Sequence, residues 1–408
     1  MFLLYIVSYL DRINIGFAAL QMNRDLGLSP AVYGFGAGIF FIGYFLFEVP
    51  SNLIMTRVGA RLWMARIMIT WGIISSAMMF VRGPASFYAL RFLLGLAEAG
   101  FFPGMILYLT YWFPSRERAR AISLFMTAVA LAGVVGGPVS GALLTMTGVG
   151  GLAGWQWLFL LEGLPAAILG FVVLVYLPDG PADARWLTQE EKVFLIERVA
   201  TDKAMRTPTR TEEALATTKD VLLSGRVWLF SLTYFGIVSA LYGISFWLPT
   251  ILRGLSGLPD FMIGALSALP YVAAAVAMVI VGRHSDSTGE RRWHVAGSAF
   301  VGAAGLLLSA MMTSPASALV AISIAAIGIF SAMPTFWAIP TAMLSGSGAA
   351  AGIALINSIG NLGGFSGPYA IGLIRTMTQS FAAALVLLAA SLVMAGLLAL
   401  AAPREGNR

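Results

Sequence analysis

The chain has 408 residues, of which 59% are hydrophobic and only 11% are charged. Soluble domains carry about 25% charged residues, so this composition excludes a protein that is surrounded by water on all sides. The absence of cysteine excludes disulfide scaffolds, thiolate metal sites and cysteine nucleophiles. A net charge of +6 would suggest nucleic acid in a soluble protein, but in a membrane protein it first reports which loops carry the basic residues.

Apolar segments and the breaker residues between them divide the chain into about twelve spans. Each is long enough to cross about 30 Å of hydrocarbon as an α-helix. Apolar runs of this length exclude an outer-membrane barrel, whose strands alternate polar and apolar residues. The sequence therefore predicts an all-α membrane protein with twelve transmembrane helices. The spans lie near 1–22, 34–56, 62–81, 86–112, 119–147, 155–177, 226–250, 261–283, 293–313, 316–342, 348–374 and 379–402.

One long polar segment, Pro178 to Gly225, separates the first six spans from the last six and holds all three lysines. Within it, Thr188 and Glu191 fit a capping box before apolar residues at helical spacing, which predicts a short amphipathic helix. The expected organisation is an N-terminal six-helix bundle over 1–177, a cytoplasmic linker over 178–225, a C-terminal six-helix bundle over 226–402 and a cytoplasmic tail over 403–408.

The basic residues gather on one side of the predicted membrane. The inner side then holds the linker, the C-terminal arginines and Arg57, Arg61, Arg66, Arg116, Arg118, Arg120, Arg283, Arg291 and Arg292. The outer loops keep only Arg24, Arg82, Arg253 and Arg375. This asymmetry predicts a multi-pass protein of a bacterial inner membrane with both termini cytoplasmic.

The start of the chain does not have the pattern of a targeting sequence. Asp11-Arg12 interrupts the first apolar stretch and no small-residue cleavage site follows, so no cleavable signal peptide is expected. Because Met1 stands almost directly inside a span, we expect a short cytoplasmic segment before it.

The two halves of the chain repeat one another at an offset of 230 positions. Two separate motifs keep this offset, which indicates a duplicated six-helix unit, as in transporters that rock one half against the other around a site at the membrane midplane. The matching positions are Gly59, Arg61 and Trp63 with Gly289, Arg291 and Trp293, and Gly133, Gly137 and Pro138 with Gly363, Gly367 and Pro368.

The loop from Gly282 to Arg292 has the pattern G-x3-D-x2-G-x-R, with Asp286 at the aspartate position and Arg291 at the arginine position. It resembles the loop of the major facilitator superfamily in which an aspartate at a helix end meets arginines that latch the cytoplasmic gate. The resemblance implies gate roles for Asp286, Arg57, Arg61 and Arg291. The N-half copy of the loop departs from the pattern, since Thr56 stands where the aspartate is expected.

A more specific resemblance, over essentially the whole chain, is to the anion:cation symporter branch of that superfamily. Members of this branch import organic carboxylates such as tartrate, sugar acids, phthalate or hydroxyphenylacetate together with protons. The residues that carry the resemblance include Tyr9 to Asn14, Gly43 to Asn52, Arg91 to Pro103, Trp112 to Pro114, Trp155 to Gly163, Trp186 to Glu191, Tyr242 to Pro249 and Asn357 to Asn361.

Charged residues inside apolar spans need a reason, because each costs roughly 2.5–3.5 kcal/mol at a helix centre. Asp11, Arg12, Arg91 and Glu98 stand in such positions and must face one another or a hydrated cavity. Arg91 and Glu98 are two helical turns apart, about 10.5 Å, and so lie on one stripe of their span. The adjacent residues Asp11 and Arg12 project about 100° apart and are expected to contact different neighbours.

The chemistry of these four residues divides into two roles. Arg12 and Arg91 are the predicted substrate-binding cations, because an arginine fork binds a carboxylate bidentately. Asp11 and Glu98 are the predicted proton-coupling groups, because a carboxyl group removed from water favours its neutral form and can carry a proton. The two histidines, His284 and His294, lie at an inner loop and are not expected to relay protons.

Further substrate-binding candidates come from the resemblance and from residue type. Tyr44 is implied to line the site, and Asn357 is implied to be the C-half substrate contact, with Asn361 one turn later as the alternative. Tyr9 is a further hydrogen-bonding candidate. Trp337 and Trp247 are expected either to wall the cavity or to pack between helices.

Two further acids, Glu48 and Glu162, are expected near the cytoplasmic ends of their spans as structural partners of loop arginines. The sequence contains no phosphate-binding loop, metal cluster or nucleophile triad, so we expect no enzyme activity, cofactor, metal or nucleic-acid partner.

We therefore predict a monomeric secondary transporter in the lipid bilayer that imports a small organic carboxylate with protons. An anion exchanger, a sodium-coupled carrier or a transporter-like anion sensor remain alternatives of the same fold. A drug exporter is disfavoured because two midplane arginines repel cationic drugs. The sequence leaves open which carboxylate is carried and with how many protons.

Overall fold

The computed structural model describes residues 1–204, 221, 223–343 and 347–402. Over these residues the chain folds into helices, and the first half contains one helix or helix pair for each predicted span. These are α1 (Phe2–Asp25), α2 (Pro30–Val58), α3 (Ala60–Ala77) with the short 3-10 helix η1 (Met78–Phe80), α4 (Pro84–Glu98), α5 (Phe101–Trp112), α6 (Ser115–Leu144) and α7 (Gly154–Tyr176).

The second half repeats this arrangement after the linker. Its helices are α11 (Gly225–Ser256), α12 (Asp260–Thr288), α13 (Arg292–Met311), α14 (Pro315–Met343), α15 (Ser347–Asn361), α16 (Gly363–Thr378) and α17 (Ala382–Ala401). Eleven segments of the described chain are long and apolar enough to cross a membrane. The remaining predicted span, 348–374, is divided between α15 and α16, so neither part reaches that length.

Short loops with ordinary helix-start chemistry separate the helices. Ser29 accepts a hydrogen bond from the backbone N–H of Val32 through its hydroxyl (3.3 Å) and precedes Pro30 in the first turn of α2. Proline also opens α4 at Pro84 and α14 at Pro315. A capping hydroxyl satisfies a free amide, and proline has none to satisfy, so both favour these starts.

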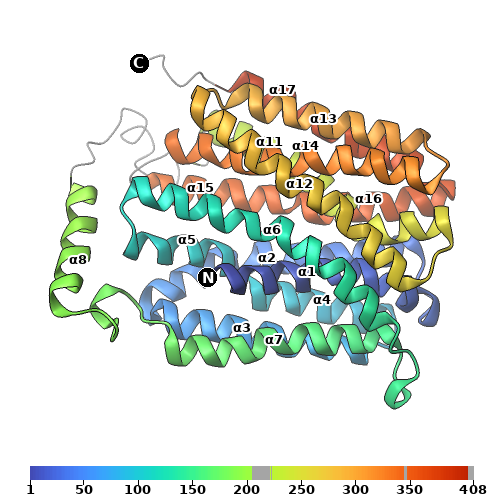
Figure 1. Cartoon of the computed structure of the whole chain (residues 1–408), viewed down its shortest axis with the longest axis horizontal. Helices are drawn as coiled ribbons and strands as arrows, with labels where there is room; N and C mark the ends of the chain where they lie inside the picture. Colours follow the sequence, from blue (N-terminus) through green and yellow to red (C-terminus); the bar gives the residue numbers. More distant parts are fainter. Residues whose placement is uncertain (205–220, 222, 344–346, 403–408) are drawn as a thin grey trace.

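Figure 1 shows the long helices running side by side along the molecule, with α8 (Gln189–Ala204) beyond one end. We call this end, where the linker leaves α7 and α11 begins, the linker end, and the opposite end the far end. The helix α1 begins and α17 ends at the linker end. The predicted tail, 403–408, most of the linker between 205 and 222, and the side chains of Arg116, Arg118 and Arg120 lie outside the described residues.

The predicted amphipathic helix of the linker is present as α8. The backbone N–H of Thr188 donates to Glu191 Oε2 (2.8 Å), and the N–H of Glu191 donates to the Thr188 hydroxyl (3.3 Å), which confirms the capping box. Arg198 on α8 pairs with Glu117 at the start of α6. The linker helix is therefore attached to the N-terminal half.

Close glycine contacts join the two halves toward the far end. A Cβ atom on Gly264 of α12 would lie 2.3 Å from the carbonyl oxygen of Gly137 on α6, and one on Gly34 of α2 would lie 2.6 Å from that of Pro368 on α16. Small residues of this kind let helix backbones approach closely in membranes. Gly137 and Pro368, two of the positions repeated between the halves, therefore lie at the seam between them.

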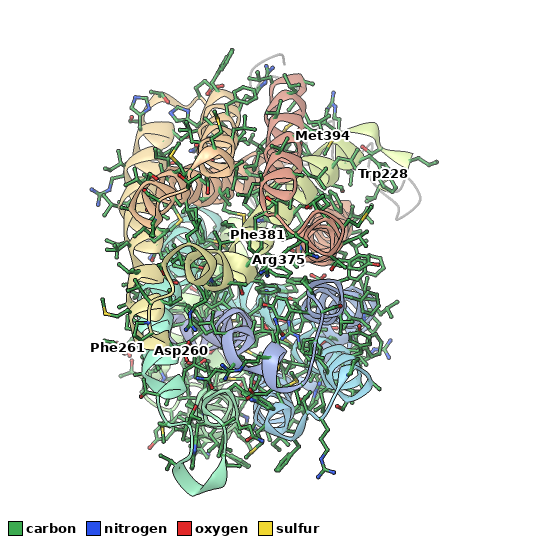
Figure 2. All side chains as sticks on the ribbon, turned by 90° about the vertical axis from the view of Figure 1, so that its right-hand side faces the viewer. Trp228, Asp260, Phe261, Arg375, Phe381 and Met394 are labelled. Atoms are coloured by element: carbon green, nitrogen blue, oxygen red, sulfur yellow. The ribbon has the colours of Figure 1, made fainter. Side chains whose placement is uncertain are left out.

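Polar contacts reinforce this far-end seam. Gln21 of α1 donates to Asp260 of α12 (2.7 Å), and Arg253 at the end of α11 pairs with the same carboxylate. The Tyr33 hydroxyl donates to the Phe246 carbonyl (2.9 Å). Figure 2 looks onto this end of the molecule, where Asp260 lies between the helices of the two halves.

The seam leads to a first prediction, on Gly264→Val. The new side chain would overlap the Gly137 backbone, so the far end should close less well. The chain has no native cysteine, and a single cysteine in place of Ala268, which is 8% exposed beside Gly137, reports this closure. We expect faster maleimide labelling of that cysteine in the Gly264→Val background. Gly254→Val is the control, because a Cβ there meets nothing within 4 Å; equal rates in both backgrounds would contradict the prediction.

Candidate functional site

The centre of the candidate site is an ion pair between Arg12 of α1 and Glu98 at the end of α4. Both side chains are buried, with exposed fractions of 7% and 2%. The Ser8 hydroxyl also donates to Glu98 (2.9 Å), and Arg12 donates through its second terminal nitrogen to the Tyr242 hydroxyl on α11 (2.9 Å). Arg12 therefore connects the acid of the N-terminal half to a helix of the C-terminal half.

Glu98 reaches this position because the predicted fourth span is broken directly after it. Pro103 has no N–H to bond the carbonyl of Ala99, four residues earlier, so a continuous helix loses a hydrogen bond there. Gly100 takes a left-handed conformation (φ +86°), and a Cβ on it would lie 2.4 Å from the Ser51 hydroxyl. The break leaves Glu98 as the last residue of α4.

Arg91 lies on α4 as predicted but does not pair with Glu98. Its guanidinium donates to the Ala37 carbonyl of α2 (2.9 Å) and lies 5.0 Å from the centre of the Phe40 ring. Arg91 is 1% exposed. The structure thus separates these two buried arginines: Arg12 is paired with an acid, whereas Arg91 donates to a backbone carbonyl.

Asp11 contacts a different set of neighbours from Arg12, as the angle between the two residues predicts. Its carboxylate accepts hydrogen bonds from Trp71 Nε1 on α3 (2.9 Å), from Asn14 Nδ2 (3.0 Å) and from the Ser75 hydroxyl. Asp11 is 1% exposed. Three donors hold it inside the N-terminal half, beside the Arg12–Glu98 pair but not in it.

A small cavity of about 30 Å³, close to the volume of one water molecule, lies between the halves at this depth. Five predicted substrate-binding residues line it: Tyr9, Arg12, Tyr44, Asn357 and Asn361. The Tyr9 hydroxyl and Arg12 Nε are buried, and the described residues offer neither of them a hydrogen-bond partner.

Glu48, on the same face of α2 as Tyr44 one turn earlier, contacts the cavity residue Asn357. The Asn357 amide and the Ser358 hydroxyl (2.9 Å) of α15 both donate to its carboxylate, which is 1% exposed. The expectation that Glu48 partners a loop arginine is therefore wrong, because the side chain points into the interior. The sequence signal for this position, which the expectation did not use, is the i, i+4 spacing from Tyr44.

The same expectation is wrong for Glu162. This residue is in the first half of α7, which starts at the far end, and its carboxylate accepts a hydrogen bond from the Ser140 hydroxyl on α6 (2.7 Å). Its exposed fraction is 4%. Glu162 thus joins two helices within the N-terminal half.

The two tryptophans lie outside the cavity lining. Trp247 is fully buried, donates to the Pro368 carbonyl (3.1 Å) and packs edge-on against Tyr33 (4.8 Å between ring centres). Trp337 packs against Tyr234 (5.0 Å), which itself lines the cavity. Of the two expected roles, lining the cavity or packing between helices, packing fits both rings. Trp337 lies behind the cavity residue Tyr234.

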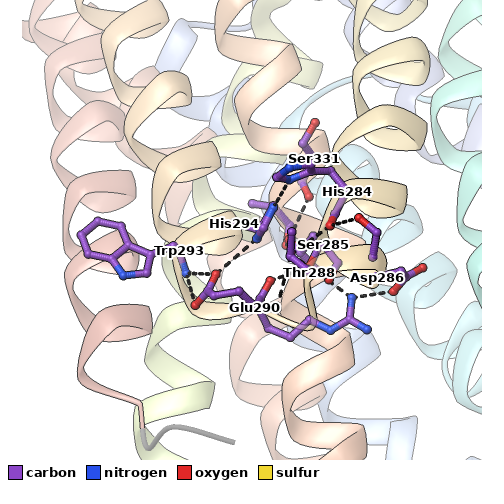
Figure 3. A network of polar contacts seen from close by, with 12 residues as sticks. His284, Ser285, Asp286, Thr288, Glu290, Trp293, His294 and Ser331 are labelled. Atoms are coloured by element: carbon purple, nitrogen blue, oxygen red, sulfur yellow. Dashed lines mark hydrogen bonds and ion pairs between the residues drawn. The ribbon is translucent and has the colours of Figure 1, made fainter.

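The predicted gate loop lies at the linker end of the C-terminal half. Asp286 pairs with Arg291 (2.6 Å), and Figure 3 shows Asp286 in a network of polar contacts with Ser285, Thr288 and Glu290 nearby. His284 and His294 contact each other beside this pair (2.7 Å), and His294 contacts Glu290 (3.2 Å). Every contact in this network stays within the C-terminal half.

The two N-half arginines of the predicted gate have different surroundings. Arg61 lies near Asp179 at the start of the linker (3.9 Å), and its backbone N–H donates to the same carboxylate (2.8 Å). Arg57 is exposed in the last turn of α2. Their gate roles, like that of the Asp286–Arg291 pair, stay predictions.

The sequence of the chain matches a known protein family. Residues 1–368 match the model of the Major Facilitator Superfamily. The chain belongs to this superfamily. Membership confirms the family predicted from the sequence, and it makes the chain a multi-pass membrane transporter and not an enzyme.

Several described transporters are similar to this chain over nearly its whole length. A "Putative tartrate transporter" of Agrobacterium vitis is 53% identical and covers 100% of this chain and 89% of its own. A "Quinolone resistance transporter" of Acinetobacter baumannii is 44% identical (96% and 89% covered), and the inner membrane transport protein RhmT of Escherichia coli is 41% identical (98% and 91% covered).

Solved structures show the same fold at low identity. A bacterial homologue of the human lysosomal transporter Spinster, in an inward-facing and occupied conformation, superposes with a TM-score of 0.77 at 17% identity, covering 98% of this chain and 95% of its own. The xylose transporter XylE of Escherichia coli gives 0.73 at 15% identity, with 98% of each chain covered. The predicted twelve-helix fold is thereby confirmed.

The contacts of Asp11 lead to a prediction on Ser75→Ala. The substitution removes one of three donors from a buried carboxylate, so we expect the free energy of unfolding to fall by about 1–3 kcal/mol. Thermal unfolding of the purified protein in detergent measures this as a lower midpoint. Ser309→Ala is the control, because the buried Ser309 hydroxyl has no partner among the described residues and its loss should leave the midpoint nearly unchanged. A Ser75→Ala midpoint equal to that of Ser309→Ala would argue against a stabilising Asp11 contact.

Proposed function

We propose that this transporter is a proton-coupled symporter that imports a small organic carboxylate, with tartrate as the first substrate to test. The observation that carries the proposal is the buried Arg12, which lines the cavity, is paired with Glu98, and retains an unpartnered Nε. A buried guanidinium with an unused donor is suited to a carboxylate. The 53% identity to a protein described as a putative tartrate transporter supports the substrate class.

In the proposed mechanism, Arg12 alternates between Glu98 and the substrate. When the substrate carboxylate engages Arg12, Glu98 loses its cationic partner, and its neutral form is favoured because an unpaired buried charge is costly. Glu98 then takes up a proton from the outer side. When the substrate leaves to the cytoplasm, Arg12 returns to Glu98, and the proton is released there.

Neutral donors around the cavity suit the remaining groups of a hydroxy acid. Tyr9, Tyr44, Asn357 and Asn361 bring hydroxyl and amide groups to the cavity from both halves. Arg91, one layer deeper in the N-terminal half, is proposed as the second anion receptor, reached when Arg12 and its helix shift. Asp11 is proposed as the second proton carrier.

The same proposal includes the membrane orientation and the gate. The linker end, with both termini, faces the cytoplasm of a cell whose inner membrane holds the protein as a monomer. Asp286 and Arg291, with Arg57 and Arg61 of the other half, then latch the cytoplasmic ends when the site opens outward. The cavity is too small for tartrate in the present arrangement, so binding requires the halves to separate.

The test is tartrate uptake into proteoliposomes. An imposed inward proton gradient without sodium should drive accumulation, because the proposed coupling ion is the proton. Accumulation that needs sodium would indicate a sodium-coupled carrier, and uptake only against a preloaded anion would indicate an exchanger. Tartrate binding without any counterflow would indicate a sensor.

The arginine assignment predicts that neither Arg12→Lys nor Arg91→Lys transports tartrate. Lysine retains the positive charge but loses the bidentate fork, so uptake should fall to background. Arg24→Lys is the control, since Arg24 is exposed in the last turn of α1, at the far end, and this variant should transport normally. Near-normal uptake by either site variant removes that arginine from the proposed site.

The proton assignment predicts that Glu98→Gln separates binding from coupling. Glutamine keeps the size and hydrogen bonding of the protonated acid, so counterflow exchange of tartrate should persist while gradient-driven accumulation is lost. Asp11→Asn should behave in the same way or more slowly. Both assays are made on the same proteoliposomes. Full accumulation by Glu98→Gln would reduce Glu98 to a structural partner of Arg12 and leave Asp11 as the candidate.

A further inference from the structure

Glu48 is a buried acid that the transport mechanism above does not use. Its carboxylate is bonded only by neutral donors, the Asn357 amide and the Ser358 hydroxyl of α15. The described residues give it no ion pair, in contrast to Glu98. An acid at this depth, ten residues or about 15 Å from the linker end of α2, is costly unless it has a role or a proton.

These bonds cross between the halves, at a depth where few polar contacts do. The polar contacts described for the far end, such as Gln21 with Asp260, lie on the other side of the cavity. At the cavity and on its linker side, the hydrogen bonds that join the halves include Arg12 to Tyr242 and those of Glu48. Here Glu48 contributes a carboxylate from the N-terminal half that accepts from neutral donors of the C-terminal half.

The charged and titratable groups around Glu48 are few. Arg12 of α1 attracts it through space without touching it, and Tyr44 of α2 and Tyr234 of α11 are the neighbouring titratable hydroxyls. Of the described side chains of α15, the amide of Asn357 and the hydroxyl of Ser358 bond to it. Against the cost of burial, its ionised form is stabilised by the hydrogen bonds from these two donors and by the more distant Arg12.

Asn357 belongs both to the cavity lining and to the contact with Glu48. It lines the cavity, where the proposed substrate presents a carboxylate, and its amide is already occupied by the carboxylate of Glu48. We propose that Glu48 is an internal substitute for the substrate, which holds Asn357 and closes the linker side while the cavity is empty, and which is displaced and protonated when a carboxylate binds. This proposal rests on the proposed function in taking Asn357 for a substrate contact.

Displacement of Glu48 from Asn357 couples substrate binding to proton uptake. When the substrate takes the Asn357 amide, the ionised Glu48 keeps one neutral donor, and its neutral form is favoured at this depth. Protonation in turn weakens the cross-half bonds, because a neutral acid is a poorer acceptor than a carboxylate. The substrate should consequently bind more tightly as the pH falls, with Glu48 contributing part of that dependence.

The first test measures L-tartrate binding to the purified full chain by calorimetry at pH 6 and pH 8. Glu48→Gln has a neutral acceptor in place of the carboxylate, so its bond to Asn357 is easier to displace. We expect tartrate to bind about fivefold more tightly than to the native chain at pH 8, and the ratio of the affinities at the two pH values to shrink. Glu162→Gln is the matched control, because Glu162 is also buried and held by a neutral donor but bonds within one half.

The second test needs no substrate. A cysteine in place of Ala354, one turn nearer the linker end than Asn357 on α15, reports opening of that side through its maleimide labelling rate at pH 8. Glu48→Gln should label several times faster than Glu162→Gln. Ser358→Ala, which removes one donor and leaves both Glu48 and Asn357 in place, should also label faster, and it keeps the test independent of how the glutamine variant folds.

The outcomes separate the two proposals. Unchanged labelling in both Glu48→Gln and Ser358→Ala overturns the closing role, whatever the substrate. Faster labelling with unchanged tartrate affinity overturns the competition for Asn357. If the native chain binds no tartrate at either pH, the proposed function fails for this substrate, while the labelling result still decides whether Glu48 holds the linker side closed.

Discussion

The cost of placing charge at membrane depth is the constraint on which the rest of this structure depends. Arg12 and Glu98 neutralise each other, whereas Asp11, Glu48 and Glu162 are held by neutral hydroxyl, amide and indole donors. Each of these arrangements needs helices from different parts of the chain to meet at one depth. The break of the fourth span at Gly100 brings Glu98 to the end of α4 beside Arg12, which makes this pairing possible.

The two ends of the seam between the halves are built from different chemistry. Toward the far end, glycine on glycine and glycine on carbonyl contacts bring backbones together, and such packing is lost all at once when the helices part. Around the cavity, the contacts are hydrogen bonds from Arg12 and Asn357 that a ligand with the same chemistry can replace. In the proposed mechanism, the far-end seam is closed by packing and the contacts around the cavity respond to the substrate.

Competition for shared donors unites the proposed mechanism. Arg12 has one acid of the protein as its partner, Asn357 has another, and both line the same cavity from opposite halves. A substrate carboxylate that engages both residues displaces two internal carboxylates at once. Each displaced acid loses a donor that stabilised its charge, and this is the physical link between substrate binding and proton uptake in the two proposals.

The sequence by itself determined the family, the helices and the depth of the polar residues, because hydrophobic length, repeated motifs and charge within apolar runs are local properties. Tyr9, Arg12, Tyr44, Asn357 and Asn361 were all named from it, and they line one cavity. Only the tertiary structure decided the pairings: Glu98 with Arg12 and not Arg91, and Glu48 and Glu162 with neutral donors and not with loop arginines. Spacing along one helix fixes a face, but the partner on that face depends on which helix packs there and on where the backbone breaks, as it does at Gly100.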